Sequence, residues 1–263
     1  CTSVSCATDI GGRVTQKSSD SKTTEALARA RGISLSSDGN LTRDMFGEEF
    51  VDFMREVSQA EDSDFEFRSD EAREADRAAL LENHPEGEDL WFFGYGSLIW
   101  NPAVLIEETR AATLEGYHRS FCLSLVIGRG TPQMPGYMLA LEEGGTCRGV
   151  IHRIQSEKID SETCILWRRE MLGTGYRSIW TQVETPQGAQ RALAFIVNRD
   201  SPRYVGQPDD ATLIAGIARA QGPMGKNADY VFNLCEHLAA HDMPDTQLET
   251  LAAKVREYMD KMA

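Results

Sequence analysis

An apolar run that stops at Gly-Tyr-Gly-Ser is the feature that most restricts how this chain can fold. Residues 90–93 read Leu-Trp-Phe-Phe, a pattern typical of a buried strand, and the glycine-rich sequence follows at once at 94–97. Glycine permits sharp turns and close backbone approach, so the strand is expected to end in a tight loop. Backbone N–H groups exposed at such a strand end can bind a small anion. An ordinary tight turn between two core segments is the alternative that the local pattern leaves open.

The composition predicts a folded domain with an acidic extension. The 263 residues are 41% hydrophobic, and no apolar run reaches the ~18–20 residues that a membrane-spanning helix needs. The net charge of −14 argues against nucleic acid and anionic membranes as partners. Twelve Asp or Glu and only three Arg fall within residues 61–89. Six cysteines without a CxxC pair favour free thiols in a reducing compartment, so a cytoplasmic location is expected.

Residues 1–89 are expected to form an N-terminal extension that is partly disordered and partly helical. The first 23 residues are rich in Ser, Thr and Gly, as disordered segments are. Helical spacing of apolar residues and a capping Ser69 predict helices over 24–31, 44–57 and 69–81. Residues 85–89 are interpreted as a linker. We expect the extension to be dispensable for chemistry, with regulation or partner binding as the alternative.

From residue 90 the pattern changes to short strands with helices between and after them. Strands are expected over 90–93, 120–126, 136–141, 149–154, 179–184 and 191–197, the last two as a hairpin. Helices are expected over 157–172, 211–221, 227–240 and after residue 245, with N-caps at Ser156, Asn227 and Asp245. Strands mixed with peripheral helices predict an α+β domain over residues 90–263.

Five blocks in this region carry a family resemblance. They are FGYGSLIWNP at 93–102, RGTPQMPG at 129–136, RREMLGTGY at 168–176, SPRYVGQP at 201–208 and GPMGKNADYVFNL at 222–234. In this order they resemble the ChaC family of γ-glutamylcyclotransferases over roughly residues 90 to 260. The resemblance implies a small closed β-barrel with flanking helices, the γ-glutamylcyclotransferase-like fold. It does not extend to residues 1–89.

The resemblance also implies a reaction that needs no cofactor. In this family the α-amine of a γ-glutamyl group attacks its own side-chain carbonyl, so that 5-oxoproline forms and the downstream amine leaves. With glutathione as the substrate, the leaving amine is cysteinylglycine. The expected function is therefore that of a glutathione-specific lyase. A cyclotransferase for another γ-glutamyl amide and a non-catalytic γ-glutamyl-binding regulator are the two alternatives.

Glu170 is the expected general acid and base. It matches the family's acidic residue in the block RREMLGTGY, near the end of a predicted helix. A helix C-terminus disfavours a carboxylate, and partial burial would act in the same direction, so the pKa of Glu170 is expected to be raised. A base that takes a proton from an ammonium group near neutral pH needs such a pKa. A surface glutamate paired with Arg168 or Arg169 is the alternative.

The other expected site residues bind substrate. By resemblance, backbone N–H groups of the glycine-rich loop hold the γ-glutamyl carboxylate and carbonyl, while tyrosines line the pocket. The expected residues are Phe93, Gly94, Tyr95, Gly96, Ser97, Leu98, Tyr176 and Tyr204. Some family members have a tighter Glu-x-Gly-Gly-Tyr link after the acidic residue, so a packed aromatic is the alternative for Tyr176. Arg129 and the Pro132/Pro135 loop either shape the pocket or support the core.

One pair of histidines suggests a competing metal site. His237 and His241 are four residues apart on a predicted helix, a spacing that can bind zinc. The order His-Glu-x-x-His is missing and no third ligand is evident, so a solvated helix face is favoured. No metal is therefore expected.

Overall fold

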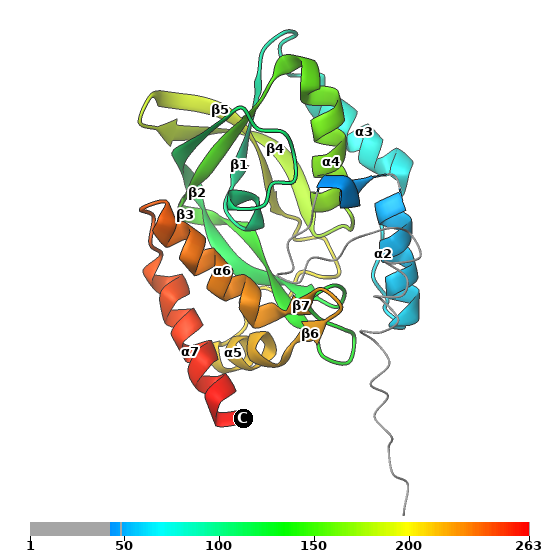
Figure 1. Ribbon diagram of the computed structural model, residues 1–263, viewed down its shortest axis with the longest axis vertical. Helices are drawn as coiled ribbons and strands as arrows, with labels where there is room; N and C mark the ends of the chain where they lie inside the picture. Colours follow the sequence, from blue (N-terminus) through cyan, green and yellow to red (C-terminus); the bar gives the residue numbers. More distant parts are fainter. Residues whose placement is uncertain (1–42, 48, 263) are drawn as a thin grey trace, which may run out of the picture.

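A closed five-stranded barrel forms the centre of the molecule (Figure 1). The computed structural model describes residues 43–47 and 49–262. The strands follow the order β1-β3-β2-β4-β5 around the barrel. They are β1 (Leu90–Gly94), β2 (Glu108–Leu125), β3 (Gly136–Ile154), β4 (Tyr176–Thr185) and β5 (Gly188–Val197). The expected α+β fold, a small barrel with flanking helices, is confirmed.

The barrel closes through two short junctions. β2 and β3 form a long antiparallel pair, β1 runs antiparallel to β3, and β4 and β5 form the expected hairpin. β1 meets β5 in parallel at the pair Phe92↔Leu193, and β2 meets β4 at the pair Thr113↔Glu184. The hairpin β4–β5 is thus joined to β1 and to β2 at one registered pair each.

The strands β2 and β3 are longer than the sequence predicts. No strand was expected over 108–119, yet β2 begins at Glu108, and β3 is continuous where two strands were expected. The first part of β2, residues 108–119, carries charged side chains on its solvent face. It therefore lacks the apolar run by which a strand is recognised.

Helices flank the barrel on two sides (Figure 1). A short 3₁₀ turn η2 (Ser97–Ile99) follows β1, and a small two-stranded sheet of β6 (Gln221–Gly222) and β7 (Gly225–Lys226) precedes α6. The helices of this region are η3 (Ser156–Lys158), α4 (Ile159–Glu170), α5 (Asp210–Arg219), α6 (Asn227–Ala240) and α7 (Thr246–Met262). No helix among the described residues is both long and apolar enough to cross a membrane.

Two of the four expected N-caps are wrong. Ser156 begins the 3₁₀ turn η3, and Lys158 is the N-cap of α4. Asn227 is the first residue of α6, and its buried amide binds the backbone of Tyr137 on β3, at 2.8 and 3.0 Å. The cap of α7 is confirmed, because the Asp245 carboxylate accepts a hydrogen bond from the Leu248 N–H.

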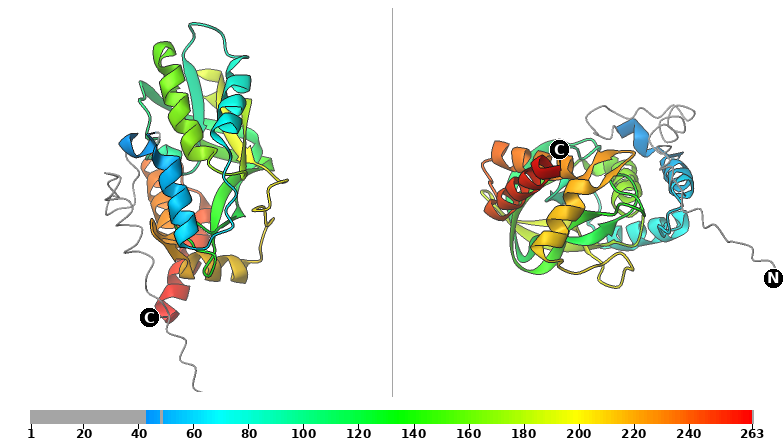
Figure 2. Two further views of the ribbon diagram at one scale, coloured as in Figure 1. Left: turned by 90° about the vertical axis from the view of Figure 1, so that its right-hand side faces the viewer. Right: turned by 90° about the horizontal axis from the view of Figure 1, so that it is seen from below.

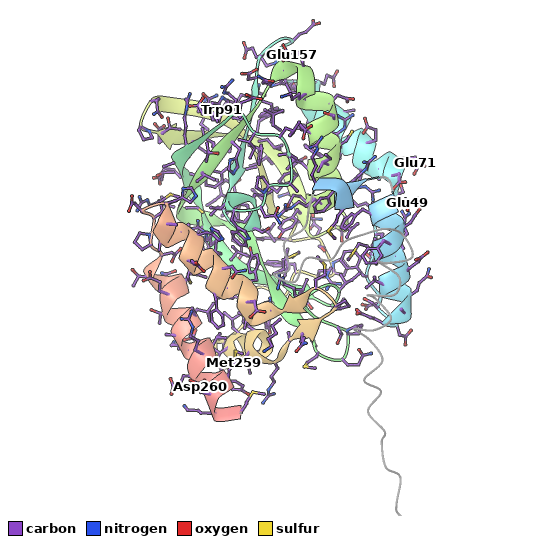
Figure 3. The ribbon with its side chains drawn as sticks, in the orientation of Figure 1. Glu49, Glu71, Trp91, Glu157, Met259 and Asp260 are labelled. Atoms are coloured by element: carbon purple, nitrogen blue, oxygen red, sulfur yellow. The ribbon has the colours of Figure 1, made fainter. Side chains whose placement is uncertain are left out.

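The described part of the extension packs on the barrel domain. It contains η1 (Arg43–Phe46), α2 (Glu49–Ala60) and α3 (Asp70–Leu81), and Ser69 caps α3 as expected. The expected helix over 44–57 is thus a 3₁₀ turn followed by a helix that starts later. α2 and α3 lie on the same side of the molecule as α4 (Figure 2), with Glu49 and Glu71 on their outer surface (Figure 3). The expected disorder of the first 23 residues and the helix over 24–31 lie outside the described residues.

Two apolar clusters meet at β1. One joins the barrel to α5, α6 and α7 and includes Phe93, while the other joins it to α2 and α4 and includes Phe92. Successive side chains of a strand point to opposite faces, so the two phenylalanines serve different clusters. The chain leaves β1 at Gly94, between these clusters, and this position places the glycine-rich loop inside the protein.

Candidate active site

The glycine-rich loop is held by hydrogen bonds to four consecutive carbonyl groups. Arg119 Nε donates to the Tyr95 carbonyl (2.7 Å), and the Ile99 N–H donates to the Gly96 carbonyl (2.9 Å). The Asn101 N–H donates to the Ser97 carbonyl (2.9 Å), and His152 Nε2 donates to the Leu98 carbonyl (2.9 Å). Each carbonyl of residues 95–98 is therefore engaged, which fixes the backbone. A loop fixed in this way can present its N–H groups to a ligand without reorganising.

His152 supports this loop as a neutral side chain. It is buried in β3, and burial lowers its pKa to about 4. At neutral pH the ring is therefore uncharged, so that Nε2–H donates to Leu98 and Nδ1 accepts from the Thr109 hydroxyl at 2.8 Å. His152 was not among the expected site residues, because nothing in the sequence connects it with the loop.

Glu170 is a nearly buried carboxylate at the last position of α4. Its side chain is 14% exposed, and Arg169 Nε donates to Oε1 at 2.8 Å. Burial raises the pKa of Glu170, while the charge and the hydrogen bond of Arg169 oppose this rise. The ion pair that was considered as an alternative is thus present together with the expected burial.

Arg169 connects Glu170 with the loop. Its guanidinium group also donates to the Ser97 hydroxyl at 2.8 Å and to the Asn101 carbonyl. The Phe46 ring lies 5.7 Å from its central carbon. With a side chain only 7% exposed, Arg169 holds Glu170 and the loop in one arrangement. From the sequence, Arg169 was expected only as a possible ion-pair partner of Glu170. Its contact with the loop depends on the fold and leaves no mark in the sequence.

Three tyrosines from different elements lie near enough to Glu170 for its charge to affect them. Tyr95 comes from the loop, Tyr176 from the start of β4, and Tyr230 from α6. Burial raises the pKa of each, and the negative charge of Glu170 raises it further. All three are therefore neutral hydrogen-bond donors at physiological pH. The longer link after Glu170 thus brings Tyr176 into the cluster, where its hydroxyl donates to the Leu139 carbonyl at 2.6 Å.

Tyr230 lies directly against the glycine-rich loop. Its hydroxyl is near the backbone N–H of Ser97, which opposes the rise in its pKa that burial causes. A Cβ atom on Gly96 would lie 2.5 Å from the same hydroxyl, so the position admits only glycine without a shift. Tyr230 was not among the expected residues, although it falls in the fifth family-like block. The sequence gives no reason to select it from the surrounding helix.

The close approach between Gly96 and Tyr230 predicts the effect of a double substitution. Gly96→Ala should lower stability by ~1–3 kcal/mol because the added methyl overpacks a buried contact. Tyr230→Phe removes the oxygen that the methyl would meet, so the double variant should be less destabilised than the two single effects added together. Chemical denaturation of the four proteins measures this coupling. Strict additivity would contradict the proposed contact.

The other expected residues do not join this cluster through the described contacts. The Tyr204 hydroxyl donates to buried Glu142 at 2.7 Å, and Arg129 donates to the Lys226 carbonyl at 3.1 Å beside β7. The Phe93 side chain is buried in the core. Pro132 and Pro135 lie in the loop before β3. A role of these residues in substrate binding remains a prediction.

The competing metal site receives no support from the described residues. His237 stacks on Trp100 with ring centroids 5.0 Å apart. Within 43–47 and 49–262, no group of three or more His, Cys, Asp or Glu side chains is arranged to hold a metal ion. Cysteines in the same range, at positions 122, 147, 164 and 235, are free thiols.

Comparisons with known proteins identify the family. A family model described as ChaC-like protein matches residues 90–258. The chain is 41% identical over 192 residues to the glutathione-specific gamma-glutamylcyclotransferase of Escherichia coli, which covers 73% of this chain and 83% of that protein. It is 30% identical over 183 residues to the human glutathione-specific gamma-glutamylcyclotransferase 1. This match covers 68% of this chain and 82% of the human protein.

A solved structure shows the same fold. The yeast gamma-glutamyl cyclotransferase specific to glutathione superposes with a TM-score of 0.60 at 23% identity. The match covers 65% of this chain and 96% of the yeast chain. The family match includes the glycine-rich loop, Glu170 and Tyr230. The chain therefore belongs to the ChaC family.

Proposed function

We propose that this protein cleaves glutathione to 5-oxoproline and cysteinylglycine. The observation that carries the proposal is the buried Glu170, linked through Arg169 to a glycine-rich loop that is held at four carbonyls. The names of the E. coli and human relatives point to glutathione as substrate. The reaction is intramolecular, so the site has to position one molecule and move protons within it.

Glu170 is the proposed acid and base. Its carboxylate takes a proton from the γ-glutamyl ammonium, and the freed amine nitrogen attacks the γ-carbonyl carbon of the same residue. When the tetrahedral intermediate collapses, the bond to the cysteine nitrogen breaks. The protonated Glu170 gives its proton to that nitrogen, takes up the second proton that the attacking nitrogen loses when it becomes the lactam amide, and passes it to the released amine, which leaves as an ammonium group. Burial holds the pKa of Glu170 above its ordinary value, which brings it closer to the pKa of the ammonium group that it must deprotonate.

The loop and the tyrosines are the proposed binding groups. Loop N–H groups bind the α-carboxylate, and a neutral phenol of Tyr95 or Tyr230 donates to the oxygen that becomes negative. Bending the γ-glutamyl arm so that amine and carbonyl meet contributes up to ~7–11 kcal/mol in ideal cases, against ~10²–10⁴-fold for proton transfer. Positioning is therefore expected to supply the larger share of the rate.

Incubation with glutathione tests the proposal. Purified protein, without added metal or nucleotide, should release 5-oxoproline and cysteinylglycine in equal amounts, as detected by mass spectrometry. Release of 5-oxoproline only from other γ-glutamyl amides would assign the site to a different substrate. Binding of glutathione without products would indicate a γ-glutamyl-binding regulator.

A cytoplasmic location is part of the proposal. The free thiols at positions 122, 147, 164 and 235 fit a reducing compartment. Recovery of the native protein outside the cytosolic fraction of its cells would contradict this assignment.

A further inference from the structure

A segment of the N-terminal extension runs along the loop that follows Glu170. Phe67 pairs with Gly173 as an isolated antiparallel bridge, and the Arg68 N–H donates to the Leu172 carbonyl at 3.0 Å. This loop connects the last residue of α4 with the first residue of β4. It therefore sets the position of Glu170 relative to Tyr176.

The Arg68 side chain holds the same loop at two further points. Nε donates to the Gly173 carbonyl and Nη2 donates to the Tyr176 carbonyl, both at 2.9 Å. The side chain is 18% exposed, and Asp76 lies 3.9 Å from Nη1. One residue of the extension thus binds three carbonyls of the stretch 172–176, two with its side chain and one with its backbone.

The contact with this loop is tightly packed. A Cβ atom on Gly173 would lie 2.6 Å from the Phe65 ring and 3.2 Å from the Glu66 carbonyl. The Arg203 guanidinium group lies over the Phe65 ring, 5.0 Å from its centre. Because Gly173 has no side chain, the extension can lie closer to the loop than it could with any other residue at this position.

A second contact reaches the residues before Glu170. The Phe46 carbonyl accepts a hydrogen bond from Arg168 Nη1 at 3.2 Å, and the Phe46 ring faces the Arg169 guanidinium group. Arg169 is the residue that pairs with Glu170. The extension thus touches the chain on both sides of the proposed base.

We propose that residues 43–47 and 49–81 form a clamp that positions Glu170, and that Arg68 is its main positioning residue. The inference rests on the proposed function, since it assigns Arg68 a part in the same reaction. It replaces the expectation that this part of the extension is dispensable. The family model begins at residue 90 and does not include the clamp.

The clamp keeps water away from Glu170. The titratable groups that face Glu170 are Arg169 on α4, Tyr95 in the loop, Tyr176 on β4 and Tyr230 on α6. Burial is the largest influence on its pKa and raises it. If the stretch 172–176 moves away, water reaches the carboxylate and the pKa falls toward its ordinary value.

Arg68→Ala in the full chain tests the clamp. We expect kcat for glutathione to fall about 10- to 100-fold, because small misplacements of reacting groups have effects of this size. KM should change less than about threefold, since the carbonyl contacts of residues 95–98 remain. The acid limb of the pH–rate profile should move to lower pH, because a general base with a lower pKa is deprotonated at lower pH. Amide hydrogens of residues 171–176 should exchange faster.

The exposed Arg177 provides a matched control. It follows Tyr176 directly, and no hydrogen bond or ion pair is recorded for its side chain within the described range, so Arg177→Ala should change none of these quantities. Arg68→Lys keeps the charge but cannot bind two carbonyls in the same way, and it should give an intermediate kcat. If Arg68→Ala does not fold, Arg68→Lys is measured by the same readouts.

Several results would overturn the clamp. A folded Arg68→Ala protein with unchanged kcat and an unchanged acid limb would do so. An equal loss of rate at every pH, without faster exchange at 171–176, would indicate a merely structural role and would also reject it. If the wild-type protein does not act on glutathione, the proposed function fails, and the exchange at 171–176 still decides whether Arg68 holds this loop.

Discussion

Glu170→Gln should lower kcat for glutathione by about 10³-fold while the fold is kept. The amide has nearly the same shape as the carboxyl group but cannot take up the ammonium proton. Proton transfer by a positioned side chain contributes ~10²–10⁴-fold, and the loss should fall in that range. Some rate should remain, because the loop and tyrosines still bend the substrate. The change should appear in kcat far more than in KM.

Glu157→Gln is the matched control for this substitution. Glu157 is exposed in η3, at the opposite end of the helical segment from Glu170 (Figure 3). The same chemical change there should leave kcat and KM unaltered. Thermal unfolding of all three proteins should be similar, since Arg169 keeps its bonds to Ser97 and Asn101 in Glu170→Gln. A fully active Glu170→Gln protein would reject the assignment of the base.

Arg169→Met should move the acid limb of the pH–rate profile to higher pH. Burial raises the pKa of Glu170, and Arg169 is the group that opposes this rise. Without the guanidinium charge the carboxyl group holds its proton more strongly, so a smaller fraction is available as base at pH 7. Activity near pH 7 should therefore fall, and it should recover in part at higher pH, where the carboxyl group loses its proton again.

Two further variants separate charge from anchoring in Arg169. Ser97→Ala removes the hydroxyl that Arg169 binds but keeps the ion pair with Glu170, so the acid limb should not move. Arg177→Met applies the same change to an exposed arginine and should have no effect. A limb that moves to lower pH in Arg169→Met would contradict the electrostatic role. Arg68→Ala is expected to move the acid limb to lower pH and Arg169→Met to higher pH. The direction of the shift therefore distinguishes the roles of the two arginines.

Local signals were sufficient for the α+β class and for the loop after β1, because an apolar run and a glycine pair mark them directly. The closed barrel and the choice of Glu170 depended on the family resemblance. The first part of β2 gave no local signal because its pairing with β3 is what makes it a strand. Propensity is a weak guide where tertiary pairing decides the structure.

Residues that act through distant contacts could not be found in this way. Arg119, His152 and Tyr230 reach the loop from β2, β3 and α6, across large separations in the chain. Their chemistry is ordinary in isolation, and only the fold shows what they touch. The same holds for Arg68, whose partners lie more than a hundred residues away.

The single registered pairs that close the barrel have a consequence for how it opens. β4 and β5 are paired with each other along their whole length, but main-chain register joins them to β1 and β2 only at Leu193 and Glu184. Segments joined by few main-chain bonds tend to open as separate cooperative units. We expect amide exchange in low denaturant to show residues 176–197 opening together, at a lower free energy than β2 and β3. A single common opening would contradict this. Such an opening would move Tyr176 away from Glu170 while the glycine-rich loop stays folded. A small population of partly opened, inactive protein should therefore exist at equilibrium.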